Sequence, residues 1–218
     1  SADPVRASFA FEANQTGASR EAVITVKTIK GASVEVKVSQ ARLEGGLAVR
    51  GIADAEDLVA FAQAVNEGGS LTPFMVDGNI VLLNDIDASS IKEWVPAGTK
   101  TSPFTGNFDG KGHAIKNISW ATDLAESPYA GIFGYARNAS VVALNVGADG
   151  DVITLKGNAA SVNAGAIVGY AEGGTVTGCT VRASQSYAGT GSGGDIRLGG
   201  ICGYSSANIE NCTNRGNI

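Results

Sequence analysis

The chain has 218 residues, 17% of them charged, and a formal net charge of −5. This length allows one large domain or two smaller ones. The acidic balance argues against binding to a nucleic-acid backbone, and no apolar run reaches the roughly 20 residues that a membrane-spanning helix needs. Glycine is abundant, with 30 residues, about twice the average usage of roughly 7%. Three cysteines and one histidine do not fit a disulfide framework, a histidine-based metal site or a catalytic triad.

The first segment, residues 1–45, is predicted to be part of a β-sandwich. Residues 34–38 alternate valine with polar residues, as in a half-buried strand. Residues 22–26 and 8–11 are two further β-rich runs, separated by turn residues. Three strands leave one face of a sheet uncovered. We therefore expect either a preceding segment to complete the sandwich or this piece to pack on the domain that follows.

This segment resembles the C-terminal half of BACON-type immunoglobulin-like domains. The resemblance rests on Asn14, Ser19-Arg20, the run 22–26 and the closing run 36–40. Such domains occur in bacterial surface proteins and in carbohydrate-degrading proteins, so the resemblance implies a surface protein. A generic sandwich spacer is the alternative interpretation. The carbohydrate binding proposed for the family is not carried over, because the sequence lacks the first half of the domain.

Residues 54–67 are predicted to form the one convincing helix of the chain. Asp54 is a natural N-cap, and Asp57 follows it in the spacing of a capping box. Apolar residues recur at i, i+3, i+4 and i+7, which gives a single apolar stripe, and Gly68-Gly69 ends the helix. The first rung of a solenoid exposes strand edges and an apolar end. We therefore expect this helix to cap a solenoid rather than to bind a membrane or a partner.

A five-residue motif recurs in the second half of the chain. It occupies residues 131–135, 166–170 and 200–204, and its tyrosines lie 35 and then 34 residues apart. A second strand-like run follows each copy. The stretches 147–162 and 184–196 are rich in small and polar residues and leave room for a third strand and a loop. A fixed period in this range predicts stacked supersecondary units, and therefore a solenoid.

Residues 51–218 resemble the GLUG-motif family of bacterial surface proteins. Several motifs occur in the expected order: the helix, the strand end 83–87, the turn 94–98, the glycine-rich segment 104–118 and the three repeats. The resemblance implies a right-handed parallel β-helix and an adhesin-like role. We expect this β-helix domain to occupy residues 46–218 and to continue beyond the C-terminus, because the last repeat has no visible cap.

Alignment of the repeats on their tyrosines predicts which side chains fill the interior. Adjacent side chains of a strand point to opposite faces, so one of two neighbouring columns is expected inside and the other more exposed or under a loop. The uniform isoleucine column is the better interior candidate; the two columns are Ile132, Ile167 and Ile201, and Phe133, Val168 and Cys202. The recurring glycines are expected at tight corners or close backbone approaches; they are Gly134, Gly169 and Gly203.

Two cysteines fall on a further interior column. Cys179 and Cys212 align with Leu144, which indicates that they act as small buried apolar residues. Stacked rungs lie about 4.7–4.9 Å apart, slightly beyond the Cβ separation of about 3.8 Å in a disulfide. We therefore expect the two cysteines to be neighbours without a bond between them.

The acidic residues form no recognisable catalytic or metal-binding set. Asp85 and Asp87 are two apart on a strand, so they can meet one carboxyl separation of a glycoside hydrolase, but a polar strand end is the favoured interpretation. Asp109, Asp149 and Asp151 lie in glycine-rich turns, and no alternating run supplies the roughly six to eight oxygens of a calcium site. No catalytic residue, metal ligand or cofactor is therefore assigned.

Aromatic side chains remain as candidates for glycan recognition. Four lie outside the aligned columns and are the weak ligand-binding candidates: Trp94, Trp120, Tyr129 and Tyr187. The three repeat tyrosines are expected to stack as a ladder along one edge, with a structural role.

The sequence thus predicts an all-β protein with a short sandwich segment, a capping helix and a parallel β-helix. We expect a non-enzymatic, adhesin-like protein at an extracellular surface, secreted or lipid-anchored through a preceding segment. It would bind a glycan, host or matrix ligand as a monomer within a longer chain. A carbohydrate-active enzyme or its substrate-binding accessory domain is the first alternative, and a structural spacer is the second. Converging carboxylates in a cleft would indicate an enzyme, and an exposed aromatic or polar strip would indicate a binding protein. The absence of both features would indicate a spacer.

Overall fold

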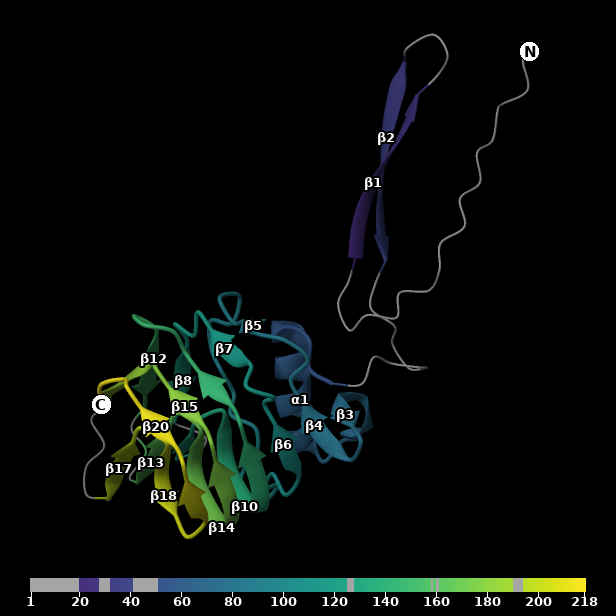
Figure 1. The fold of residues 1–218 in the computed structure, drawn as a ribbon. Helices are drawn as coiled ribbons and strands as arrows, with labels where there is room; N and C mark the ends of the chain where they lie inside the picture. Colours follow the sequence, from purple (N-terminus) through teal and green to yellow (C-terminus); the bar gives the residue numbers. More distant parts are fainter. Residues whose placement is uncertain are drawn as a thin grey trace. The chain divides into compact units, whose positions relative to one another are not determined.

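The computed structural model divides the chain into two units, residues 1–49 and residues 50–218, and each is described by itself (Figure 1). The residues that the structure describes are 20–27, 32–40, 51–124, 128–157, 159, 161–189 and 194–218.

The first unit contains an antiparallel hairpin of β1 (Arg20–Lys27) and β2 (Ser33–Gln40), in which Ala22 lies opposite Val38. The two strands match two of the predicted runs, and the third run, residues 8–11, lies outside the described residues. Val34 is 63% exposed, so the prediction of a half-buried strand is wrong here. The physical reason is that, among the described residues of this unit, the two-stranded ribbon has no second layer to cover its apolar face.

The second unit begins with the predicted helix, α1 (Ala55–Glu67). The Asp54 carboxylate accepts a hydrogen bond from the Asp57 N–H at 2.9 Å, and Gly68 ends the helix with a left-handed φ of 69°. The apolar stripe is buried, with Phe61 fully inside. Its ring contacts phenylalanines of the first coils, with centroid distances of 5.7–6.2 Å to Phe74, Phe104, Phe108 and Phe133. The helix therefore covers the start of the solenoid, as predicted.

The rest of the unit is a parallel β-solenoid of about four turns, which confirms the predicted β-helix (Figure 1). Four sheets run along it. The first contains β4 (Asn79–Val81), β6 (Asn107–Asp109), β10 (Phe133–Val142), β14 (Val168–Thr177), β18 (Cys202–Ser205) and β19 (Asn208–Glu210). The second contains β5 (Ile86–Asp87), β7 (Ala114–Lys116), β11 (Asn145–Val146), β15 (Thr180–Val181) and β20 (Thr213–Asn214). The third contains β8 (Ala121–Asp123), β12 (Val152–Lys156) and β16 (Ser184–Ala188), and the fourth β9 (Tyr129–Ala130), β13 (Val162–Gly165) and β17 (Ile196–Gly199).

An antiparallel strand closes the N-terminal edge of the first sheet. After the short 3₁₀ helix η1 (Thr72–Phe74), β3 (Met75–Val76) turns back and pairs with β4. Ile52 adds a parallel bridge to Leu82. Together with α1, these elements cover the edge and the apolar end that the first coil would otherwise expose.

The repeats stack in the predicted register. Tyr135 pairs with Tyr170, and Tyr170 with Tyr204. The motif and the run after it form one ten-residue strand in β10 and β14, rather than two. The intervening residues join the strand because they continue the same parallel ladder, for example Ser140 with Thr175.

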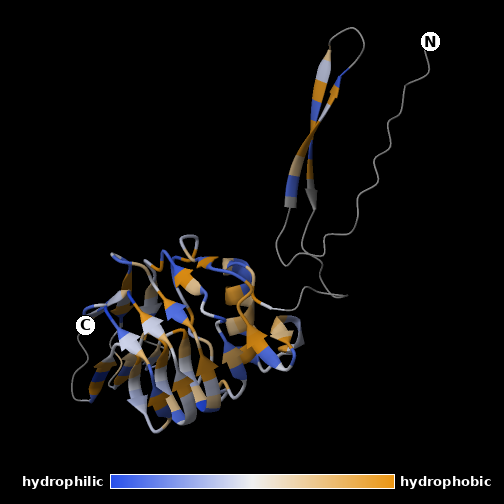
Figure 2. Cartoon of the chain, in the orientation of Figure 1, coloured by the Kyte–Doolittle hydropathy of each residue, from blue (hydrophilic) through white to orange (hydrophobic). Residues whose placement is uncertain are grey.

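Both motif columns are buried where coils cover them on each side. Ile132, Ile167, Phe133 and Val168 are all 0% exposed. The expectation that the Phe133 column would be more exposed is therefore wrong, because the first sheet's column also packs inside the coil. Ile201 and Cys202 lie on the last described coil and are half-buried. Figure 2 shows that the strands of the solenoid carry both apolar and polar residues.

The last three coils turn from the first to the second sheet through a left-handed residue. The φ angles are 49° at Ala143, 65° at Gly178 and 53° at Asn211, and these three positions align. The following residue points inward, and it is Leu144, Cys179 or Cys212. Cys179 is fully buried and all three cysteines are free, which confirms unbonded neighbours. Burial raises the pKa of the Cys179 thiol to about 12.

The motif glycines mark close backbone approaches. A Cβ on Gly169 would lie 2.7 Å from the Ala130 nitrogen and 2.7 Å from the Asn163 oxygen, and one on Gly203 would lie 2.3 Å from the Ala164 nitrogen. The starts of β14 and β18 therefore lie against β9 and β13 of the fourth sheet. This is the close backbone approach that was one of the two predicted roles of the glycines.

We expect Gly169→Ala to lower the free energy of unfolding by about 1–3 kcal/mol, because the new methyl group must displace backbone on two strands. Gly69→Ala is the control, since its Cβ would meet nothing closer than 3.5 Å. Urea denaturation of both variants measures the difference. A Gly169→Ala protein as stable as the control would show that this backbone contact is not tight.

Candidate ligand-binding groove

Two outward-facing columns cross the second sheet. The first runs through Ala114, Asn145, Thr180 and Thr213, which pair in register. The second lies two residues further along each strand and consists of Lys116, Gly147, Arg182 and Arg215. Its register follows from the backbone, because Gly147, Arg182 and Arg215 each donate an N–H to the equivalent carbonyl of the preceding coil at 2.7–2.8 Å. Ile115, Val146 and Val181 lie between the columns and are fully buried, so the side chains of both columns project outward.

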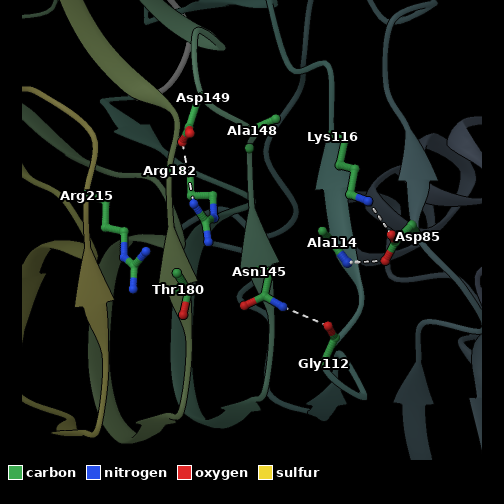
Figure 3. A pocket seen from close by; sticks show the side chains of 11 residues that line it. Asp85, Gly112, Ala114, Lys116, Asn145, Ala148, Asp149, Thr180, Arg182 and Arg215 are labelled. Atoms are coloured by element: carbon green, nitrogen blue, oxygen red, sulfur yellow. Dashed lines mark hydrogen bonds and ion pairs between the residues drawn. The ribbon is translucent and has the colours of Figure 1, made fainter.

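A shallow polar groove of about 510 Å³ lies over these columns (Figure 3). We call it the polar groove; its lining includes Asp85, Lys116, Asn145, Thr180, Arg182 and Arg215. Gly147 forms part of its floor, because the column has no side chain there. Its φ is 83°, and a Cβ would lie 2.5 Å from the Ala183 methyl group. The backbone of the next coil thus takes the space that a side chain would need here, which requires glycine.

The basic residues of the polar groove differ in how they are paired. Lys116 forms an ion pair with Asp85, and its hydrogen bond, followed by that of the Ala114 N–H, holds the pKa of the Asp85 carboxyl below its usual range. Arg182 meets Asp149 only at 3.5 Å, and the Asp149 side chain is 87% exposed. Among the described residues, no ion pair involves Arg215. The arginine end of the groove therefore keeps most of its capacity to bind an anion.

Hydrogen-bonding groups lie beside the arginines. The Asn145 amide nitrogen donates to the Gly112 carbonyl at 2.7 Å, which leaves its oxygen as an acceptor. Figure 3 shows Thr180 and Asn145 next to Arg182 and Arg215 on neighbouring strands. Neighbouring strands lie about 4.8 Å apart. The groove thus offers polar groups at a regular spacing, without an aromatic or large apolar side chain in its lining.

The two tryptophans are almost fully buried. Trp94 is 2% and Trp120 is 1% exposed, and their rings stack at a centroid distance of 5.2 Å. The Trp94 indole N–H donates to the Gly131 carbonyl at 2.8 Å. The prediction that Trp120 is available to a ligand is wrong, because its ring fills the interior of the early coils. Trp94 also lines a second pocket of about 340 Å³ beside α1, so its role in ligand binding stays a prediction.

The two candidate tyrosines are half-buried and lie apart from the polar groove. Tyr129 packs edge-on against Tyr135 and Tyr170, at 5.1 and 5.8 Å between centroids. Tyr187 lies on β16, and its hydroxyl is buried without a hydrogen-bond partner among the described residues. Their role in ligand binding stays a prediction.

The repeat tyrosines form the expected ladder. Tyr135 and Tyr170 stack at 4.8 Å, and Tyr170 and Tyr204 at 4.5 Å. The Glu172 carboxylate accepts hydrogen bonds from the Tyr135 hydroxyl at 2.7 Å and from Arg137 at 2.8 Å. These contacts tie neighbouring coils together, which is a structural role.

The aspartates act mainly as anchors between coils and turns. Asp87 accepts from the Ser89 N–H and the Asn117 amide, both at 3.0 Å, and Asp85 accepts from the Ala114 N–H at 2.9 Å. The buried Asp151 accepts from the backbone of Ile118 and of Ala148. In the part of the chain that the structure describes, no group of three or more His, Cys, Asp or Glu side chains is arranged to hold a metal ion.

The polar groove was not among the sequence-based candidates, although the repeats contain its signal. Arg182 follows Cys179 by three residues, and Arg215 follows Cys212 by three. The alignment that places the cysteines in one column therefore also places the arginines in one column. The repeat pattern does not show that the arginine side chains point outward, because their orientation depends on how the second sheet forms.

Residues 194–218 match the family model described as the GLUG motif. One coil carries a GLUG motif. The matched segment comprises β17 to β20, and these strands pair in register with the equivalent strands of the preceding coil. No curated protein and no solved structure matched the chain. No helix among the described residues is long and apolar enough to cross a membrane. The motif and the β-solenoid together fit a repeat protein of the surface type.

Proposed function

We propose that this chain is a non-enzymatic, adhesin-like module of an extracellular, cell-surface protein, and that it binds glycans. The observation that carries the proposal is the polar groove, an exposed strip of hydrogen-bonding and charged side chains on stacked strands. A spacer needs no such strip. A solenoid presents equivalent positions at a constant interval, which suits a ligand made of repeating units.

The acidic groups of the groove support binding rather than hydrolysis. Asp85 is engaged by Lys116 and by the Ala114 N–H. Asp149 lies beside Arg182 and is largely exposed. A glycoside hydrolase needs one carboxyl kept protonated as an acid and a second as nucleophile or base. The lowered pKa of Asp85 works against the first role, so the enzyme is the less favoured alternative.

A glycan and matrix-protein array with the whole 218-residue chain tests this proposal. We expect binding to a set of glycans, and we expect Thr180→Tyr to reduce it at least about ten-fold by filling the groove. Thr175→Tyr is the control, because Thr175 is exposed on the first sheet, away from the groove.

The array outcomes separate the alternatives. Unchanged binding in Thr180→Tyr, or loss of binding in Thr175→Tyr alone, would place the ligand elsewhere on the solenoid. Binding to none of the glycans or matrix proteins would favour the spacer. Shortened oligosaccharides, detected by mass spectrometry after incubation with the chain, would favour the enzyme.

A further inference from the structure

We infer that the polar groove recognises acidic saccharides, with the carboxylates of uronic-acid units held by Arg182 and Arg215. This inference rests on the proposed function and names the class of glycan. The two arginines occupy the same position on adjacent coils. The Arg182 N–H donates to the Val146 carbonyl, and the Arg215 N–H donates to the Val181 carbonyl, both at 2.8 Å.

The arginine pair is suited to a carboxylate by geometry and by charge. A guanidinium presents a planar fork of N–H donors that matches a carboxylate in a bidentate arrangement. Arg215 has no ion-pair partner among the described residues, and the Arg182–Asp149 contact at 3.5 Å is a weak surface pair. A ligand carboxylate therefore has little to displace.

The neighbouring groups are suited to sugar hydroxyls. The free oxygen of Asn145 can accept a hydrogen bond, and the Thr180 hydroxyl can donate or accept one. Gly147 adds no side chain to this part of the lining, and its φ of 83° disfavours any other residue there.

The groove favours a saccharide over other anions. A protein partner would place its strongest contacts in a desolvated patch rich in aromatic residues, and the lining contains none. A nucleic acid is bound through a long basic patch or stripe, and this acidic chain offers the groove only a short basic column. The charge that attracts the ligand is thus local to the arginine pair.

Isothermal titration calorimetry tests the inference with the 218-residue chain. The probes are an oligogalacturonate, the same oligomer with its carboxylates methyl-esterified, and an oligoglutamate of the same charge. We expect the acidic oligomer to bind about ten-fold or more tightly than its ester, and to weaken as salt is added. Arg182→Gln and Arg215→Gln should each weaken it about ten-fold.

Arg137→Gln is the matched control. Its side chain is 40% exposed, close to the 43% of Arg182, but it pairs with Glu172 on the first sheet. We expect it to bind the acidic oligomer as the parent does. An equal loss in this variant would overturn the assignment to the polar groove.

Three further results would contradict the inference in different ways. Equal affinity for the acid and the ester would overturn carboxylate recognition while leaving glycan binding intact. If oligoglutamate bound as tightly as the oligogalacturonate, the assignment of a saccharide ligand would be overturned. Absence of binding to these oligomers and to every glycan on the array would overturn the proposed function as well.

Discussion

Phe61→Ala is expected to lower the free energy of unfolding by about 3–5 kcal/mol, because it empties a fully buried site of one large ring. The ring has 0% exposure and meets four other phenylalanines. These belong to η1 and to the coils of β6 and β10, so the loss weakens the contact between the helix and the strands it covers. The melting temperature should fall by roughly 10 °C.

Val59→Ala is the control for this change. Val59 lies on the same helix but is 44% exposed, so its truncation should change stability by no more than about 0.5 kcal/mol. Thermal unfolding followed by circular dichroism measures both. If Phe61→Ala melts at the temperature of the Val59 variant, the helix is not the cap of this solenoid.

Cys179→Asp is expected to prevent folding, whereas Cys179→Val should cost less than about 1.5 kcal/mol. The Cys179 sulfur is fully buried and faces the carbonyl oxygens of Thr177 at 3.5 Å and Val141 at 3.8 Å. A carboxylate there would be desolvated and would meet only acceptors, which costs several kcal/mol. Soluble expression and the far-ultraviolet circular dichroism spectrum report the result.

Cys212→Asp keeps the test informative if the Cys179 variant yields no protein. Cys212 occupies the same column one coil later, but it is half-buried. We expect this variant to fold with reduced stability, because water reaches part of the side chain. A Cys179→Asp protein that melts like the parent would show that the column does not lie inside the coil.

Much of the solenoid followed from local patterns in the sequence. The tyrosine period set the register of the coils, and the Asp54 and Gly68 signals set both ends of the helix. These features depend on chain-local chemistry, in which a cap, a turn or a repeat is encoded by a few adjacent residues. The cysteine column could be predicted for the same reason, because the same position of successive repeats is occupied by Leu144, Cys179 and Cys212.

The positions of the tryptophans could not be predicted in this way. Trp94 and Trp120 lie outside the aligned motif, so the repeat gave no information on their direction. They are buried because two irregular segments bring the rings together at 5.2 Å. The valines of β2 show the opposite error, since an alternating pattern predicts a covered face but Val34 is 63% exposed.

The sequence by itself determined that this chain repeats, that the repeats stack and that a helix covers their start. Periodicity and capping act over short stretches and are visible in the residues themselves. Only the tertiary structure decided which surfaces the stacked repeats present. Arg182 and Arg215 are 33 residues apart in the chain, and they become neighbours because one coil returns the backbone to the adjacent strand of the second sheet.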